Sequence, residues 1–170
     1  MILSTHSVVG AAAAAVITTD PVVGVAVGVA SHFLLDMIPH WDYTLVSKRT
    51  PESHGVVHKT MVFDRSFLGD CVKLGVDFGL GILAVLAFVV LTPSFASVLV
   101  AGLVGGVLPD VLQFGYFLAP RPLGWLQSFH EWIHSEYEIP QPLVGAFSQF
   151  LIAVLAVMVW AGVMTFIDIL

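Results

Sequence analysis

The sequence predicts an all-α integral membrane protein: one domain over residues 1–170, a bundle of about five transmembrane helices with a short interfacial helix. Hydrophobic residues make up 58% of the chain and charged residues only 11%, too few polar groups to cover a water-soluble domain. The mean hydropathy of +0.95 agrees. The apolar residues gather in five runs near or above the length that crosses a bilayer. Turn residues and two polar segments separate these runs.

The first two helices are expected over residues 2–18 and 22–38. Thr18-Thr19-Asp20-Pro21 forms the turn between them, because Asp can cap a helix that has Pro in its first turn. Each run is about 17 residues, or ~25 Å, near the lower limit for crossing the hydrocarbon core. The sequence leaves open whether they span fully or form a re-entrant hairpin.

Three longer helices are expected over residues 65–91, 95–118 and 143–168, with polar loops at 41–64 and 120–142. The second loop holds a short helix from Leu123 to Tyr137. Antiparallel threading places every histidine on one side of the membrane: His6, His32, His40, His54, His58, His130 and His134. The six basic residues fall on the same side, so the positive-inside rule makes it the cytoplasmic face of a cell (inner) membrane.

Composition also excludes some functions. The net charge of −6 reflects a shortage of basic residues, and no basic patch suggests nucleic-acid binding. Cys71 is the only cysteine, which rules out an internal disulfide and a Cys-type zinc finger. The oligomeric state stays open.

The stretch from residue 31 to residue 42 carries the first candidate site. It contains His32, Asp36, His40 and Asp42 at the end of an apolar helix. His32 and Asp36 share one helix face, and Pro39 ends the helix so that His40 and Asp42 can fold back. Ionisable groups at a membrane boundary are costly and usually indicate a functional site.

Two more residues extend this set. His6 lies on the same predicted side, and Asp110 ends a weak repeat in which Gly102-x-x-Gly105-Gly106-x-Leu108-Pro109-Asp110 aligns with the helix that ends at Asp36. Imidazole and carboxylate ligands together suit a divalent metal, Zn²⁺ first and Mn²⁺ or Fe²⁺ as alternatives. The competing interpretation is a polar network that only holds helices together.

His130-Glu131-Trp132-Ile133-His134 is a His-Glu-x-x-His motif. On a helix it presents two histidines one turn apart as metal ligands, with Glu131 as general base. The alternative is an amphipathic helix lying at the membrane interface, with its aromatic residues among the headgroups.

Two carboxylates outside these motifs complete the candidates. Asp77 falls inside the third predicted helix, so its burial demands a partner, either the metal or a site histidine. Together with Asp42 and Glu131, we assign it a base or orienting role. His54 and His58 are interpreted as a solvated loop pair, with substrate contact as the alternative.

Thr5-His6-x-x-x-Gly10, with apolar helices ending in Leu-Leu-Asp36 and Leu-Pro-Asp110, resembles the YdjM-like family of inner-membrane proteins, described as membrane-bound metal-dependent hydrolases. The resemblance implies that His6 is the Thr-His position and that Asp36 or Asp110 is the Leu-Pro-Asp position. The family's Asp-x-Asp-His run is replaced here by Asp36-Met-Ile-Pro-His40-Trp-Asp42, and its His-Arg-Gly-x-Thr-His stretch has no clean counterpart.

Together these observations predict a membrane-embedded hydrolase in which a His- and Asp-bound divalent metal activates water at the cytoplasmic interface. An interfacial site favours a lipid-like or membrane-bound substrate. The alternatives are a His-Glu-x-x-His intramembrane metalloprotease, a metal transporter, and a non-enzymatic membrane protein with a structural polar cluster.

Overall fold

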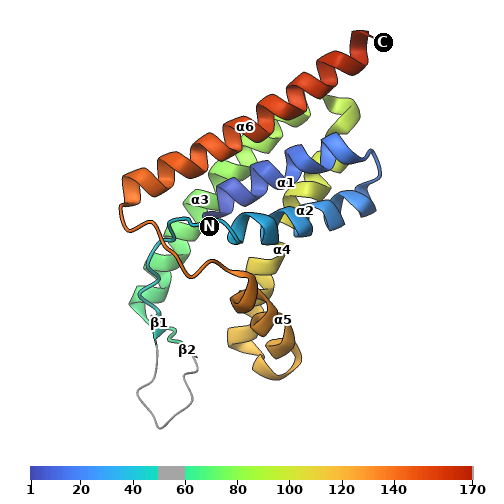
Figure 1. Cartoon of the computed structure of the whole chain (residues 1–170). Helices are drawn as coiled ribbons and strands as arrows, with labels where there is room; N and C mark the ends of the chain where they lie inside the picture. The colour runs from blue at the N-terminus through green and yellow to red at the C-terminus, as the bar shows by residue number, and fades with distance from the viewer. Residues whose placement is uncertain (50–59, 170) are drawn as a thin grey trace.

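A computed structural model describes residues 1–49 and 60–169 of the chain, and over these residues it is a bundle of six α-helices (Figure 1). The helices are α1 (Leu3–Ile17), α2 (Pro21–Asp36), α3 (Arg65–Leu91), α4 (Ala96–Leu118), α5 (Pro120–Ile133) and α6 (Pro142–Ile169). A 3₁₀ turn at Pro93–Phe95 precedes α4, and the two-residue strands β1 (Lys48–Arg49) and β2 (Thr60–Met61) pair antiparallel. The predicted all-α membrane bundle is confirmed.

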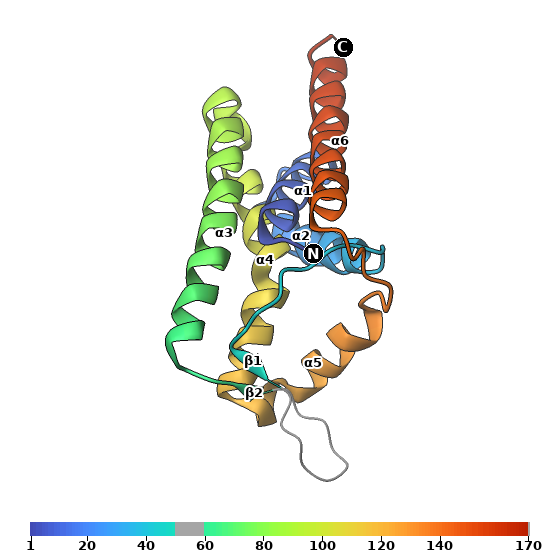
Figure 2. The same ribbon diagram turned by 90° about the vertical axis from the view of Figure 1, so that its left-hand side faces the viewer.

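Three stretches are long and apolar enough to cross a membrane: Arg65–Leu91, Pro93–Leu118 and Pro142–Phe166. The helices α1 and α2 are apolar but contain only 15 and 16 residues, about 22–24 Å of helix against a hydrocarbon core of about 30 Å. The α1 helix lies in the middle of the bundle, in contact with α2, α3, α4 and α6 (Figures 1 and 2). It is therefore covered by protein along most of its length.

The turn between α1 and α2 follows the sequence prediction. The Asp20 side chain accepts hydrogen bonds from the backbone N–H groups of Val22 and Val23, at 2.7 and 3.2 Å, and Pro21 is the first helical residue. This cap satisfies two amides that the helix itself leaves free. At the other end α2 stops at Asp36, three residues before Pro39, which restricts the backbone that precedes it.

Glycines bring α1, α2 and α4 unusually close together. A Cβ atom added at Gly28 or Gly10 would collide with the backbone carbonyl of Gly102, and one added at Gly106 would collide with the carbonyl of His6. Small residues at such crossings let helix backbones touch, as membrane helix pairs prefer. The close approach sets the histidines of α1 and α2 against α4.

The segments that follow α2 and α5 lie side by side. The N–H of Ser135 donates to the carbonyl of Asp36 at 2.7 Å, and the N–H of Ile139 donates to that of His40 at 2.9 Å. The α5 helix begins at Pro120 and ends at Ile133, so the expected bounds of Leu123 and Tyr137 were wrong at both ends. His134 consequently lies just after the helix, in extended backbone.

Candidate metal centre

Five imidazoles and three carboxylates meet at the end of the bundle that carries α5. They come from α1 (His6), α2 (His32 and Asp36), the following loop (His40 and Asp42), α4 (Asp110), and the end of α5 with the residue after it (His130 and His134). The structure thus brings together every metal ligand that the sequence suggested. The other two histidines, His54 and His58, lie outside the described residues.

Asp36 is at the centre of this cluster and is 1% exposed. Its Oδ1 lies 3.2 Å from Nε2 of His6, and its Oδ2 lies 3.1 Å from Nε2 of His32 and 3.0 Å from Nε2 of His130. Asp110 approaches from α4, with Oδ1 3.9 Å from Nε2 of His32. The rings of His6 and His32 are stacked, with centroids 3.9 Å apart.

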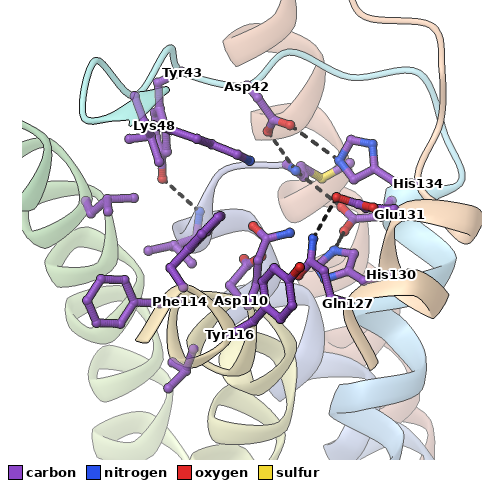
Figure 3. Close-up of a pocket in the computed structure, with 18 of the residues that line it drawn as sticks. Asp42, Tyr43, Lys48, Asp110, Phe114, Tyr116, Gln127, His130, Glu131 and His134 are labelled. Carbon is purple, nitrogen blue, oxygen red and sulfur yellow. Dashed lines mark hydrogen bonds and ion pairs between the residues drawn. The ribbon is translucent and has the colours of Figure 1, made fainter. Parts of the chain in front are cut away.

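A second group lies beside the first. Oδ2 of Asp42 is 3.3 Å from Nε2 of His40 and 3.4 Å from Nε2 of His134, and these two nitrogens are 3.2 Å apart. Oδ1 of Asp36 is 3.9 Å from Nε2 of His40, so Asp36 connects the two groups. Figure 3 shows Asp42, His130 and His134 converging from the loop and from α5.

Backbone carbonyls fix the protons on three of these rings. Nδ1 of His32 lies 2.7 Å from the carbonyl oxygen of Gly106. Nδ1 of His40 lies 2.6 Å from that of Ile38, and Nδ1 of His134 lies 3.1 Å from that of Ser135. A carbonyl only accepts hydrogen bonds, so we assign the ring proton to Nδ1 in each case. In a neutral ring Nε2 then carries a lone pair directed into the cluster, the arrangement that outer hydrogen bonds give metal-binding histidines.

Some of the ring nitrogens in the cluster have no hydrogen-bond partner. Nε2 of His32 and both ring nitrogens of His6 are buried without a hydrogen-bond partner. Nε2 of His40 lies 3.2 Å from Nε2 of His134 and 2.8 Å from the Met1 amino nitrogen, so a positive charge already serves this pair of rings. Ligand atoms bound to one tetrahedral zinc at 2.0–2.1 Å are separated by about 3.3 Å. The observed spacings fit a metal ion as well as they fit shared protons.

The electrostatics of the cluster favour positive charge. The α-amino group of Met1 lies 2.8 Å from Oδ1 of Asp42, 2.8 Å from Nε2 of His40 and 3.2 Å from Oδ1 of Asp36. Burial alone would lower the pKa of this amino group, but the neighbouring carboxylates outweigh it and raise the pKa. Contact with Asp42 also raises the pKa of His134.

The pKa of the Asp42 carboxylate is likewise set by burial and by its charged neighbours, which act in opposite directions. Burial alone would raise its pKa, but its contacts with His134, His40 and the Met1 ammonium hold the pKa well below the ordinary value. The carboxylate is therefore kept ionised and available to a cation.

Five residues of the cluster line a cleft of about 910 Å³ (Figure 3): Asp36, Asp42, Asp110, His130 and His134. Leu74 of α3 and Phe114 and Phe117 of α4 contribute apolar walls. Lys48 also lines the cleft, with its Nζ 5.7 Å from the centre of the Phe117 ring. The centre is thus open to a ligand that has both an apolar and a charged part.

Asp77 is not brought into the cluster. Its carboxylate accepts hydrogen bonds from the backbone N–H groups of Leu3 and Ser4, at 2.6 and 3.3 Å, and from the Tyr43 hydroxyl at 2.5 Å. This half-buried carboxylate therefore has the first backbone N–H groups of α1 as its partners. It acts on the site by holding the helix that carries His6.

Glu131 lines the cleft, where its carboxylate accepts a hydrogen bond from Nε2 of Gln127 at 3.0 Å. The two histidines of its motif turn to different groups: His130 contacts Asp36 and His134 contacts Asp42. Their ring centres are 6.1 Å apart. The motif therefore serves two neighbouring positions, and Glu131 lies on the wall above them.

Several supporting groups escaped the sequence analysis. Tyr43 and the Gly106 carbonyl carry no signal in the sequence, because their role depends on which helices touch. Gln149 is different, since an amide in an apolar helix must find partners: it accepts from the N–H of Ile2 at 2.9 Å and donates to the carbonyl of Trp41 at 2.7 Å. Comparisons with known protein families, with curated proteins and with solved structures find no match.

Proposed function

We propose that the chain is a membrane-embedded, metal-dependent hydrolase whose divalent ion binds at the floor of the cleft. The observation that carries this proposal is that Nε2 of His32 and both ring nitrogens of His6 are buried beside the Asp36 carboxylate without a hydrogen-bond partner. A structural network would be expected to pair donors with acceptors, because an unpaired buried polar group costs about 1–3 kcal/mol. A cation bound between Asp36 and these two rings would give Nε2 of both His6 and His32 a partner.

The residues present fit such an ion. His32 and His130 each place Nε2 near 3 Å from Oδ2 of Asp36, and Asp110 and His6 would complete the shell. Without cysteine the set is typical of catalytic zinc, with Mn²⁺ and Fe²⁺ as alternatives. A divalent ion there lowers the pKa of a bound water toward ~7 and polarises a carbonyl or phosphoryl group.

Glu131 is the group we assign to proton transfer, since it lines the cleft beside His130 and its hydrogen bond to Gln127 leaves a carboxylate oxygen available. Asp42 stays ionised and orients His40 and His134. Asp77 positions α1 and is not assigned to the chemistry.

The surroundings of the cleft support a lipid-like or membrane-bound substrate. Phe114 and Val111 line the cleft and are 37% and 58% exposed. On α5, Trp125 and Trp132 point outward with 73% and 79% of their surface exposed, as expected for a helix at the headgroup level. The positive-inside rule places this face on the cytoplasmic side of an inner membrane. Membership of the YdjM-like family is part of the proposal.

The geometry favours this hydrolase over a metalloprotease of the His-Glu-x-x-His type. That mechanism needs both histidines on one ion, whereas His130 and His134 here contact different carboxylates. A transporter would need polar groups along a path to the far face, and the described part of α6 beyond Gln149 offers a hydroxyl only at Thr165.

The test is the metal content of detergent-purified protein, measured by elemental mass spectrometry without chelators. We expect zinc, manganese or iron at one or more ions per chain, lost in the His32→Ala/Asp36→Ala double variant. Asp70→Asn is the matched control, because Asp70 is also a buried carboxylate but bonds Ser47 and Lys73. Metal-free wild type that cannot be reloaded contradicts the proposal.

A further inference from the structure

The cluster divides into two halves that share one carboxylate. We propose that the centre holds two divalent ions bridged by Asp36, and that its substrate is a phosphate ester. This inference rests on the proposed function, and it specifies both the metal site and the class of bond that is cleaved.

The division follows the two oxygens of Asp36. Oδ2 faces the inner half, at 3.1 Å from His32 and 3.0 Å from His130. Oδ1 faces the other way, 3.2 Å from His6, 3.2 Å from the Met1 amino group and 3.9 Å from His40 of the outer half. A carboxylate whose two oxygens face different ligand sets has the geometry of a bridge between metals.

Each half has a ligand set of its own. In the inner half, ligand atoms of His32, His130 and Asp110 lie within 4.8 Å of one another, and in the outer half those of Asp36, His40 and His134 do. Asp42 adds a carboxylate to the outer half through contacts of 3.3 and 3.4 Å. Eight side chains exceed what one zinc takes, which is four ligands, whereas two ions use them all.

The outer half is already built to hold a cation. The Met1 ammonium is buried there between Asp42, Asp36 and the Nε2 atom of His40. A divalent ion replaces the ammonium as the positive charge of this half. Such an ion would also be within reach of Nε2 of His40 and of His134, which lie 3.2 Å apart.

The charge of a two-ion centre points to an anionic substrate. Three carboxylates, those of Asp36, Asp42 and Asp110, leave one positive charge on two divalent ions, and a buried excess charge favours a ligand of opposite sign. Lys48 adds a cation to the cleft wall, on which Glu131, Glu136 and Glu138 also lie. Two metal ions about 3.5–4 Å apart are the arrangement that holds the attacking and leaving oxygens in phosphoryl displacement.

The reaction that follows is hydrolysis of a phosphate ester. The water oxygen bonds to phosphorus, and the bond between phosphorus and the alcohol oxygen breaks with its electron pair going to that oxygen. Glu131 takes the proton that the water loses and returns it to the alcohol, so one water is consumed for each ester cleaved. The apolar walls from Leu74, Phe114 and Phe117 would receive the alcohol portion.

Metal stoichiometry tests the two-ion centre without relying on activity. We expect two ions per chain in the wild type, one in His134→Ala and one in His130→Ala, and two in the control Glu136→Gln, which changes an exposed carboxylate of the cleft outside the cluster. One ion per chain that persists in His134→Ala overturns the two-ion centre and leaves the proposed function standing. No ion in the wild type overturns both.

A second measurement on the wild type alone covers the case in which a variant does not fold. Protein saturated with Mn²⁺ should give the electron paramagnetic resonance spectrum of an exchange-coupled pair, and added inorganic phosphate should change it. A spectrum of isolated Mn²⁺ at saturation overturns the shared centre.

Substrate class is tested with metal-loaded protein and three probes. Phosphatidic acid in detergent micelles, p-nitrophenyl phosphate and p-nitrophenyl acetate represent a lipid phosphate ester, a soluble phosphate ester and a carboxylic ester. We expect phosphatidic acid to be cleaved at least tenfold faster than the acetate. Equal rates on both phosphate esters support a phosphate ester as the substrate but a soluble one instead of a lipid. Cleavage of the acetate alone overturns the substrate assignment.

Discussion

Replacing Asp77 with alanine should destabilise the protein while leaving its metal content intact. The change removes the acceptor of two backbone N–H groups at the start of α1 and of the Tyr43 hydroxyl. Loss of a helix cap costs about 1 kcal/mol, and loss of a hydrogen bond to a charged group costs about 1.5–3 kcal/mol. The free energy of unfolding should therefore fall by about 2.5–4 kcal/mol.

The assay is thermal unfolding in detergent, followed by ion counting at saturating metal. For a chain of this size each kcal/mol moves the melting temperature by about 2–4 °C, so we expect a decrease of roughly 5–16 °C. Tyr43→Phe removes only one of the three hydrogen bonds and should cause a smaller decrease. Asp20→Ala is the matched control, since Asp20 caps α2 at the far end of the hairpin, and it should cost about 1 kcal/mol.

The reasoning is refuted if Asp77→Ala unfolds at the wild-type temperature but loses its ions or its activity. That outcome would place Asp77 among the groups that touch metal or substrate, as the sequence first suggested. A large decrease in melting temperature with full ion content supports its role in positioning α1.

Three further predictions follow from the packing and from the site. Removing metal with a chelator should lower the free energy of unfolding by about 2.7 kcal/mol relative to protein at a hundredfold excess of ion over Kd, and re-addition should restore the melting temperature. Gly28→Ala should cost about 1–3 kcal/mol by chemical denaturation because its Cβ meets the α4 backbone, whereas Gly75→Ala, which meets nothing within 4 Å, should gain about 0.5–1 kcal/mol. Glu131→Gln should keep its ions in elemental analysis and lose 10²–10⁴-fold in hydrolysis, about the contribution of general acid–base catalysis; unchanged turnover would remove Glu131 from proton transfer.

Helix positions could be predicted because they depend on local information. Hydropathy and turn residues located α3 at residues 65–91 with the bounds that the structure has, and the Asp20-Pro21 start of α2 follows from capping alone. The end of α5 could not be predicted in this way. His134 leaves the helix because the chain after Ile133 pairs with the segment after α2, through Ser135 and Ile139, and that pairing is a property of the tertiary structure.

The same distinction applies to the site. Threading predicted that His6, His32 and His130 would share one side of the membrane, because only the direction of each helix matters for that inference. Their convergence on Asp36 depends on how closely α1, α2 and α4 pack, which the Gly10, Gly28 and Gly102 contacts decide. Asp77 shows the limit of sequence reasoning most directly. Its need for a partner could be inferred from its position in an apolar helix, but the partner is the backbone of another helix, which the sequence cannot identify.

The position of α1 explains how an apolar bundle can hold so many polar groups. This helix is enclosed by α2, α3, α4 and α6, so the charges at its N-terminal end face protein and the cleft instead of hydrocarbon. The Asp36 carboxylate there is 1% exposed and needs positive charge beside it, because an uncompensated buried charge costs several kcal/mol. An ion that supplies this charge binds the folded chain and has no comparable site in the unfolded one. We therefore expect the metal to hold the ends of α1, α2, α4 and α5 together as well as to act on water, so that metal affinity and stability should change in parallel across the ligand variants.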